Sequence, residues 1–178
     1  MQCHPLAGTG GIHREGAWMS KENPDLAPIC MRARSFAARG QIEDALDLYG
    51  DVLKVDPEYA LAYADRGTVF AMTKRFEPAM QDLERAFSLG YSDSSALSTA
   101  GTICMETAQY GKALNFYERA IALNPDYPFT YYNRASVHLA MGNRKAAIAD
   151  LEKCLRMGPE DDFKEVILRR LKELEQGA

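Results

Sequence analysis

Apolar residues recur along this chain three or four positions apart, and the helical segments that they mark come in pairs. The clearest pair lies within residues 94–127, where two short helices are predicted around a tight turn and are closed by Asn124-Pro125. Shifting this segment by 34 residues in either direction finds the same pattern again. A self-similarity of this length predicts a solenoid of helix–turn–helix units, each of which buries its apolar face against the next.

The strongest markers of the repeat are positions of fixed residue size. Two of these positions hold small residues: Ala33, Gly67, Gly101 and Ala135 at the first, and Ala45, Ala79, Ala113 and Ala147 at the second. Four residues after each of the second set comes a bulky apolar residue, at Tyr49, Leu83, Tyr117 and Leu151. Three residues further on stand Val52, Ala86, Ala120 and Cys154. Two helices approach closely only where side chains are small, and bulky residues fill the space on either side. One closing position holds Pro57, Tyr91, Pro125 and Pro159, and proline ends a helix because it cannot extend one.

This pattern resembles the tetratricopeptide repeat family over about residues 26–161. The resemblance implies an all-α fold, a right-handed superhelical α-solenoid with repeats at 26–59, 60–93, 94–127 and 128–161. The sequence departs from the family in two respects. The second copy closes with Gly90-Tyr91, and Arg32, Arg66 and Arg134 stand where the family often has leucine.

The two ends of the chain lie outside the repeats. Residues 162–178 carry apolar residues at helical spacing with charges between them, which predicts a C-terminal capping helix. Residues 1–25 share none of the periodicity, and we expect an irregular or disordered arm. One hypothesis is that the native chain begins at Met19 and that residues 1–18 are not native.

Charge and composition narrow the class of function. The net charge of −4 and the pI near 5.4 argue against binding to nucleic acid or to an anionic membrane. The sequence shows neither an apolar run of transmembrane length nor a secretory signal. Its four cysteines, Cys3, Cys30, Cys104 and Cys154, are scattered, which favours reduced thiols and a cytoplasmic location.

The sequence contains no motif for catalysis or for binding a cofactor, so we expect a non-enzymatic protein without cofactor or metal. Cys3, His4 and His13 are ligand-type residues, but a leader with incidental side chains is the favoured interpretation. His138 is expected to be a satisfied core residue. The acidic residues of second helices, as in QDLERA and ADLEKC, are expected on the solvated surface.

The family resemblance places function in a concave groove lined by the first helix of each repeat, where an extended or helical peptide binds. The residues at the corresponding positions are Arg34, Leu61, Asp65, Thr68, Met72, Thr102, Glu106, Phe129, Tyr132, Asn133 and Ser136. The same positions also include Cys30, Met31, Ser98 and Thr99. For Met31, Leu61 and Phe129 the alternative is that they pack against the next repeat.

Chaperone-binding members of the family hold a two-carboxylate tail with a clamp of lysine, asparagine and arginine. The matching positions here are Cys30, Arg34, Asp65, Ser95 and Thr99 in one frame and Ala64, Thr68, Thr99, Phe129 and Asn133 in the other, so the heat-shock-chaperone carboxylate clamp is not present. The expected groove runs from the cation Arg34 through an acidic, hydroxyl-rich middle to an aromatic end at Phe129 and Tyr132.

We therefore interpret the chain as an adaptor or scaffold whose groove binds a protein or peptide with an apolar or aromatic anchor. The alternative is a self-associating protein, for example a homodimer, that pairs through its terminal repeat or capping helix.

Overall fold

The computed structural model describes residues 26–176, and within this range it contains helices and no strand. The helices are α1 (Leu26–Ala38), α2 (Ile42–Val55), α3 (Ala60–Met72), α4 (Phe76–Ser88), α5 (Ser94–Glu106), α6 (Tyr110–Leu123), α7 (Pro128–Ala140), α8 (Arg144–Arg156) and α9 (Asp161–Gln176). The predicted all-α solenoid is confirmed. The expectations for residues 1–25 lie outside the described residues.

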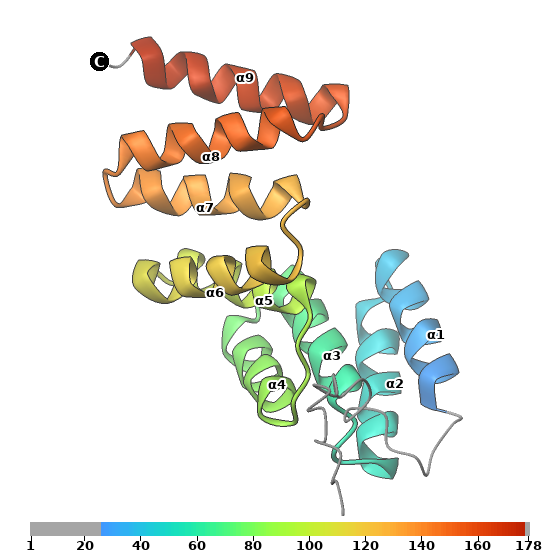
Figure 1. The fold of residues 1–178 in the computed structure, drawn as a ribbon. Helices are drawn as coiled ribbons and strands as arrows, with labels where there is room; N and C mark the ends of the chain where they lie inside the picture. The colour runs from blue at the N-terminus through green and yellow to red at the C-terminus, as the bar shows by residue number, and fades with distance from the viewer. Residues whose placement is uncertain (1–25, 177–178) are drawn as a thin grey trace, which may run out of the picture.

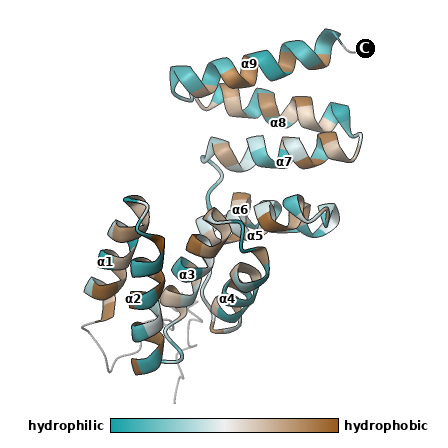
Figure 2. Ribbon diagram, turned by 180° about the vertical axis from the view of Figure 1, so that it is seen from behind, coloured by the Kyte–Doolittle hydropathy of each residue, from teal (hydrophilic) through white to brown (hydrophobic). Residues whose placement is uncertain are grey.

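The first eight of these helices form consecutive antiparallel pairs that stack into an elongated array, with α9 at the C-terminal end (Figure 1). The helix axes turn from one pair to the next, so that α1 and α2 run across the direction of α7 and α8 (Figure 1). Each helix carries apolar residues interspersed with hydrophilic ones (Figure 2). Every pair thereby presents an apolar side to its neighbours and a polar side to solvent.

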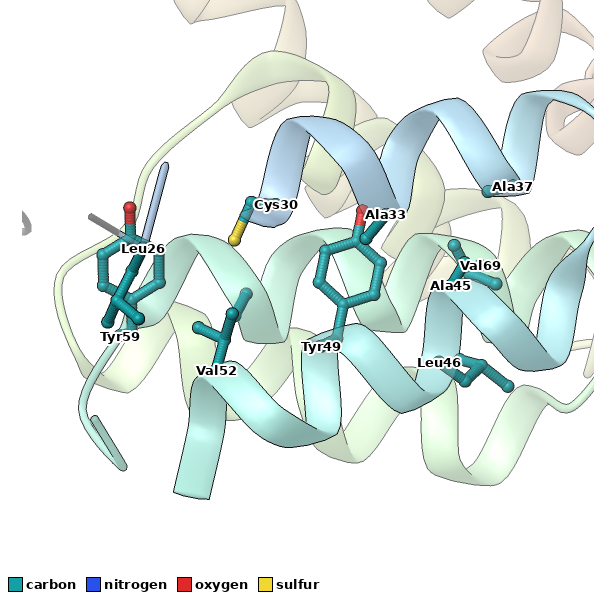
Figure 3. Close-up of a cluster of buried hydrophobic side chains, with 11 residues drawn as sticks. Leu26, Cys30, Ala33, Ala37, Ala45, Leu46, Tyr49, Val52, Tyr59 and Val69 are labelled. Atoms are coloured by element: carbon teal, nitrogen blue, oxygen red, sulfur yellow. The ribbon is translucent and has the colours of Figure 1, made fainter. Parts of the chain in front are cut away.

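The residues of fixed size form the centre of each pair. All four marker alanines are fully buried, as are Tyr49, Leu83, Tyr117 and Leu151 and the four residues three positions further on. In the first pair, Tyr49 points from α2 toward α1 beside Ala33, with Val52 and Cys30 next to it (Figure 3). The size pattern in the sequence therefore reports the actual contacts between paired helices.

The turn within each pair has one left-handed residue, at Gly40, Lys74, Ala108 and Gly142, with φ between 57° and 78°. Two of the four turns thus adopt this conformation without glycine, the residue that adopts it at least cost. The connections after each pair alternate instead. The second and fourth pairs leave through Gly90 and Gly158, both with positive φ, whereas the first and third have a proline closure without such a glycine.

Two arginines at the leucine-like position form ion pairs inside the repeats. Arg66 of α3 donates to both carboxylate oxygens of Asp82 in α4 at 2.7 and 2.8 Å, and Arg134 of α7 does the same to Asp150 in α8 at 2.9 and 2.6 Å. The acidic residues are only 7% and 6% exposed. The expectation that the acids of QDLERA and ADLEKC lie on the solvated surface is therefore wrong for Asp82 and Asp150. Each carboxylate can lie inside the protein because an arginine on the partner helix donates to both of its oxygens.

The last helix packs on the fourth pair through a narrow apolar stripe. Ile167 is fully buried, and Phe163, Leu171 and Leu174 are partly buried in the same cluster. Phe163 stacks on Phe129 of α7, with 4.2 Å between ring centroids. The remaining surface of α9 is mostly charged, as expected of a helix that covers the end of an array.

The close approach of α5 and α6 gives a test of this packing. A Cβ atom added to Gly101 would lie 2.8 Å from Cε1 of Tyr117, whereas nothing lies within 4 Å of one added to Gly50 in α2. Gly50→Ala should raise the free energy of unfolding by up to about 1 kcal/mol through helix propensity. Relative to that control, Gly101→Ala should be less stable by about 1–3 kcal/mol, because the Tyr117 ring must shift and strain its hydroxyl contact with Thr102. Urea denaturation followed by circular dichroism measures both, and equal effects would contradict the packing described.

Candidate functional site

Two cavities lie next to each other along the first helices of the pairs. The first, which we call the charged cavity, has a volume of about 410 Å³ and is lined by residues of α1 to α3, of α5 and of the connection before α5: Arg34, Ala37, Ala38, Tyr49, Ala64, Asp65, Thr68, Val69, Met72, Tyr91, Asp93, Ser95 and Ala96. The second, the neutral cavity, has a volume of about 380 Å³ and is lined mainly from α3, α5 and α7: Thr68, Ala71, Met72, Phe76, Ser95, Ser98, Thr99, Thr102, Ile103, Tyr127, Phe129 and Asn133. Thr68, Met72 and Ser95 line both, so the cavities form one continuous groove.

The charged cavity is built around an ion pair between two different repeats. Arg34 of α1 donates from Nε and Nη2 to the two carboxylate oxygens of Asp65 in α3, at 2.8 and 2.9 Å. The arginine side chain is 52% exposed and the aspartate side chain 15% exposed. Burial raises the pKa of Asp65, and the Arg34 guanidinium counteracts this rise. The pair therefore joins the first two repeats and keeps a largely buried carboxylate compensated.

A second carboxylate, Asp93, faces the same cavity. It is the N-cap of α5, and its Oδ1 accepts hydrogen bonds from the backbone amides of Ser95 and Ala96 at 2.9 and 3.1 Å. Burial raises the pKa of Tyr91 to about 12, and the negative charge of Asp93 adds to this rise. The same charge adds to the rise that burial causes in the pKa of Asp65. The charge of Asp93 thus acts on Asp65 across the charged cavity.

The neutral cavity is lined by apolar side chains, hydroxyls and one amide. Three of its lining residues are large and exposed: Met72 is 62%, Phe129 45% and Tyr127 42% exposed. Around them stand the hydroxyls of Ser95, Ser98, Thr99 and Thr102 and the amide of Asn133. This surface can take up an apolar side chain and can offer hydrogen bonds to the peptide backbone beside it.

The structure brings together most but not all of the residues predicted for the groove. Seven of them line the two cavities: Arg34, Asp65, Thr68, Met72, Thr102, Phe129 and Asn133. Leu61 is half-buried against the first core cluster, and Tyr132 makes an edge contact with Phe163 of α9 at 5.3 Å between centroids. Ser136 donates to the backbone carbonyl of Tyr132, and Glu106 is exposed at the end of α5. These last four line neither cavity.

The predicted separation of charge along the groove is wrong, because Arg34 and Asp65 bind each other. Cys30, which was also expected among the groove positions, is buried in the first core cluster rather than exposed in the groove. Met31 is 61% exposed and lines neither cavity.

Several lining residues were missed because they lie outside the repeat positions used for the prediction. Tyr91 and Asp93 belong to the connection between α4 and α5, and Tyr127 to the connection between α6 and α7. The unusual Gly90-Tyr91 closure was the available signal, since a tyrosine in place of proline puts a large side chain beside the groove.

The described residues offer little reactive chemistry. Burial raises the pKa of Cys30 and of Cys154 to about 11, so neither thiol is a nucleophile at neutral pH. Nε2 of the half-buried His138 lies 4.0 Å from Oδ2 of Asp150, while its buried Nδ1 makes no hydrogen bond within the described chain. His138 is therefore only partly the satisfied core residue expected. Residues 26–176 contain no cluster suited to a metal ion, and none of their helices is both long and apolar enough to span a bilayer.

Comparisons with known proteins agree with this architecture. Two family models described as tetratricopeptide repeat match residues 30–92 and 101–173. Human tetratricopeptide repeat protein 6 is 26% identical over 141 residues, which cover 76% of this chain and 27% of that protein. The chain thus spans about a quarter of the length of this relative.

Two solved structures show the same fold. PilF of Pseudomonas aeruginosa superposes with a TM-score of 0.71 at 21% identity, covering 86% of this chain and 76% of that one. A thermophilic tetratricopeptide protein of Thermus thermophilus gives 0.72 at 21% identity, with 84% and 83% covered. At these identities the likeness concerns the fold alone.

The ion pair at the groove makes stability depend on pH in a defined direction. Arg34→Gln should lower the free energy of unfolding by about 1–3 kcal/mol at neutral pH, because Asp65 stays buried without its counter-charge. The folded-state pKa of Asp65, already raised by burial, then rises further above its unfolded value. The loss relative to wild type should therefore shrink as the pH falls through that pKa. Urea denaturation at about pH 7 and about pH 5 measures this, with Arg34→Gln/Asp65→Asn as the control that has no uncompensated charge. A loss that is equal at both pH values would contradict this account.

Proposed function

The chain belongs to the tetratricopeptide repeat family, whose members generally mediate interactions between proteins, and on that premise we propose a non-enzymatic adaptor or scaffold. Its ligand is an extended or helical peptide segment of a partner protein, bound along the groove that the charged and neutral cavities form. The apolar anchor of that peptide enters the neutral cavity.

The single observation that carries this proposal is the exposure of large apolar side chains inside a hollow. Met72, Phe129 and Tyr127 are exposed, although all three line the neutral cavity. Exposed apolar groups gathered in a concavity are typical of binding sites, and aromatic residues are enriched among binding hot spots. A methionine at the junction of the two cavities suits such a site, because its flexible side chain adapts to different partners.

The aromatic anchor region differs from the one expected from sequence. Tyr132 and Phe129 both contact Phe163, so part of the predicted aromatic end holds α9 in place. The exposed part of Phe129 remains available in the cavity beside Tyr127, with 5.4 Å between their centroids. We therefore assign the anchor contact to Met72, Tyr127 and Phe129 rather than to Phe129 and Tyr132.

Charge in the groove supports the absence of a carboxylate clamp. Among the described residues that line the two cavities, Arg34 is the one cation, and both oxygens of Asp65 occupy it. An acidic tail would meet Asp65 and Asp93 instead of a free basic group. A heat-shock-chaperone tail is thus not the ligand that we propose. Three buried free thiols, Cys30, Cys104 and Cys154, suit the cytoplasmic location that forms part of the proposal.

Self-association through the terminal repeat or the capping helix remains the alternative, and the surface of the capping helix lends it little support. On α9, Leu168 is the one large apolar side chain counted as strongly exposed, at 47%, and the residues around it are mostly charged. A single exposed leucine is ordinary surface rather than a dimer interface.

The anchor contact can be tested with a matched pair of charge insertions. Peptides selected on the wild-type protein from a phage-displayed random library should carry an apolar or aromatic residue at a fixed position. Met72→Glu should weaken the binding of such a peptide by roughly tenfold or more, because it places a charge in the neutral cavity. Met141→Glu is the control, since Met141 is 44% exposed in the turn before α8 and lines neither cavity.

Fluorescence anisotropy gives the dissociation constants, and circular dichroism checks that both variants are folded. Equal affinity for all three proteins would remove the groove as the binding surface.

A further inference from the structure

We infer that the charged cavity is a subsite for a basic side chain, a lysine or arginine of the same bound peptide, next to the apolar anchor. This inference rests on the proposed function of the groove and names the second element that the groove recognises.

The first argument is the charge of the lining. The charged cavity contains the carboxylates of Asp65 and Asp93 and the guanidinium of Arg34. Arg34 is committed to both oxygens of Asp65, so one negative charge in the cavity is left without compensation. A cation from a ligand fits this charge, whereas an anion would be repelled.

The second argument is the orientation of Asp93. Both backbone amides that it caps at the start of α5 donate to Oδ1, and neither donates to Oδ2. The backbone of α5 thus fixes the carboxylate through one oxygen, and the second oxygen can accept from an ammonium or guanidinium group. A carboxylate held in this way loses little entropy when a ligand binds.

The third argument is a buried hydroxyl of the same cavity that makes no hydrogen bond of normal geometry within the described chain. Tyr49 is fully buried and lines the charged cavity, yet its hydroxyl forms no hydrogen bond of normal geometry with the described residues. The hydroxyl still interacts with Arg34 and Asp65, since contacts with Tyr49 and Arg34 lower the pKa of Asp65 against the rise caused by burial. Buried polar groups usually have a partner of good geometry, so this weakly bonded hydroxyl has remaining capacity for a polar group that enters the cavity.

The remaining lining suits the stem of a long basic side chain. Ala37, Ala38 and Val69 supply apolar contacts for methylene groups, and Tyr91 adds an aromatic ring at the same cavity. Lysine and arginine bury their stems along apolar surface while their charged ends reach polar partners.

The test uses Asp93→Asn, which removes the charge but keeps a residue that caps helices equally well. The control is Glu106→Gln, which changes the net charge of the protein by the same amount at the far end of α5, outside both cavities. The probes are a phage-displayed random peptide library and, from it, one selected synthetic peptide together with its counterpart in which the basic residue is replaced by glutamine.

We expect the library to yield lysine or arginine at a fixed distance from the apolar anchor on the wild-type protein and on Glu106→Gln, but not on Asp93→Asn. The selected peptide should bind Asp93→Asn roughly tenfold more weakly than wild type at low salt, with the difference shrinking as salt is added. The glutamine peptide should bind wild type and Asp93→Asn equally.

Other outcomes separate this inference from the proposed function. If peptides lack a basic residue, or if Asp93→Asn and Glu106→Gln weaken binding equally, the subsite is overturned, while loss of binding in Met72→Glu would still uphold the groove. If Met72→Glu also binds normally, the proposed function falls together with the subsite.

Discussion

The structure depends on how closely the two helices of each pair approach one another. At the crossing, small residues of the first helices leave room for bulky side chains of the second: Tyr49 lies beside Ala33 (Figure 3), and in the third pair even a methyl group on Gly101 would collide with Tyr117. Interiors are packed at the density of organic crystals, so the bulky neighbours are placed by this distance. Because every pair meets the same constraint, all four have nearly the same shape and can stack. The groove follows from this regularity, since stacking brings the first helices side by side.

Charged residues reinforce the stack at α3, the helix that contributes to both cavities. Two consecutive residues of α3 bind in different directions: Asp65 binds Arg34 of α1, and Arg66 binds Asp82 of α4. One ion pair therefore joins neighbouring repeats at the groove, and the other joins the two helices of one repeat in the interior. Breaking either would leave a largely buried carboxylate, which costs more than the intact pair contributes. The ion pairs thus hold α3 in one orientation and fix the wall that the cavities share.

The sequence predicted the helices and their packing well because these depend on local spacing and residue size. Ala45 and Tyr49, for example, were singled out by residue size and are fully buried. The site was predicted less completely. Repeat position alone could not show that Arg34 would be neutralised by Asp65, or that Tyr132 would contact Phe163 of α9. Nor could it show that Tyr91 and Asp93, which lie in a connection, would line a cavity formed by helices. These features arise from contacts between segments distant in sequence, and no periodicity encodes them.

Several features of the repeats, the closing turns among them, alternate along this array, so that they recur every second repeat. The first and third pairs share a central tyrosine, a proline closure without a positive-φ glycine and a second helix of 14 residues, as in α2 and α6. The second and fourth share a central leucine, the interior arginine–aspartate pair, a glycine closure and a second helix of 13 residues, as in α4 and α8. Neighbouring interfaces are therefore of two kinds, and each kind of repeat is built to meet the other. An internal insertion or deletion therefore keeps matched joints only if two repeats are added or removed together, because a single one would place two repeats of the same kind side by side.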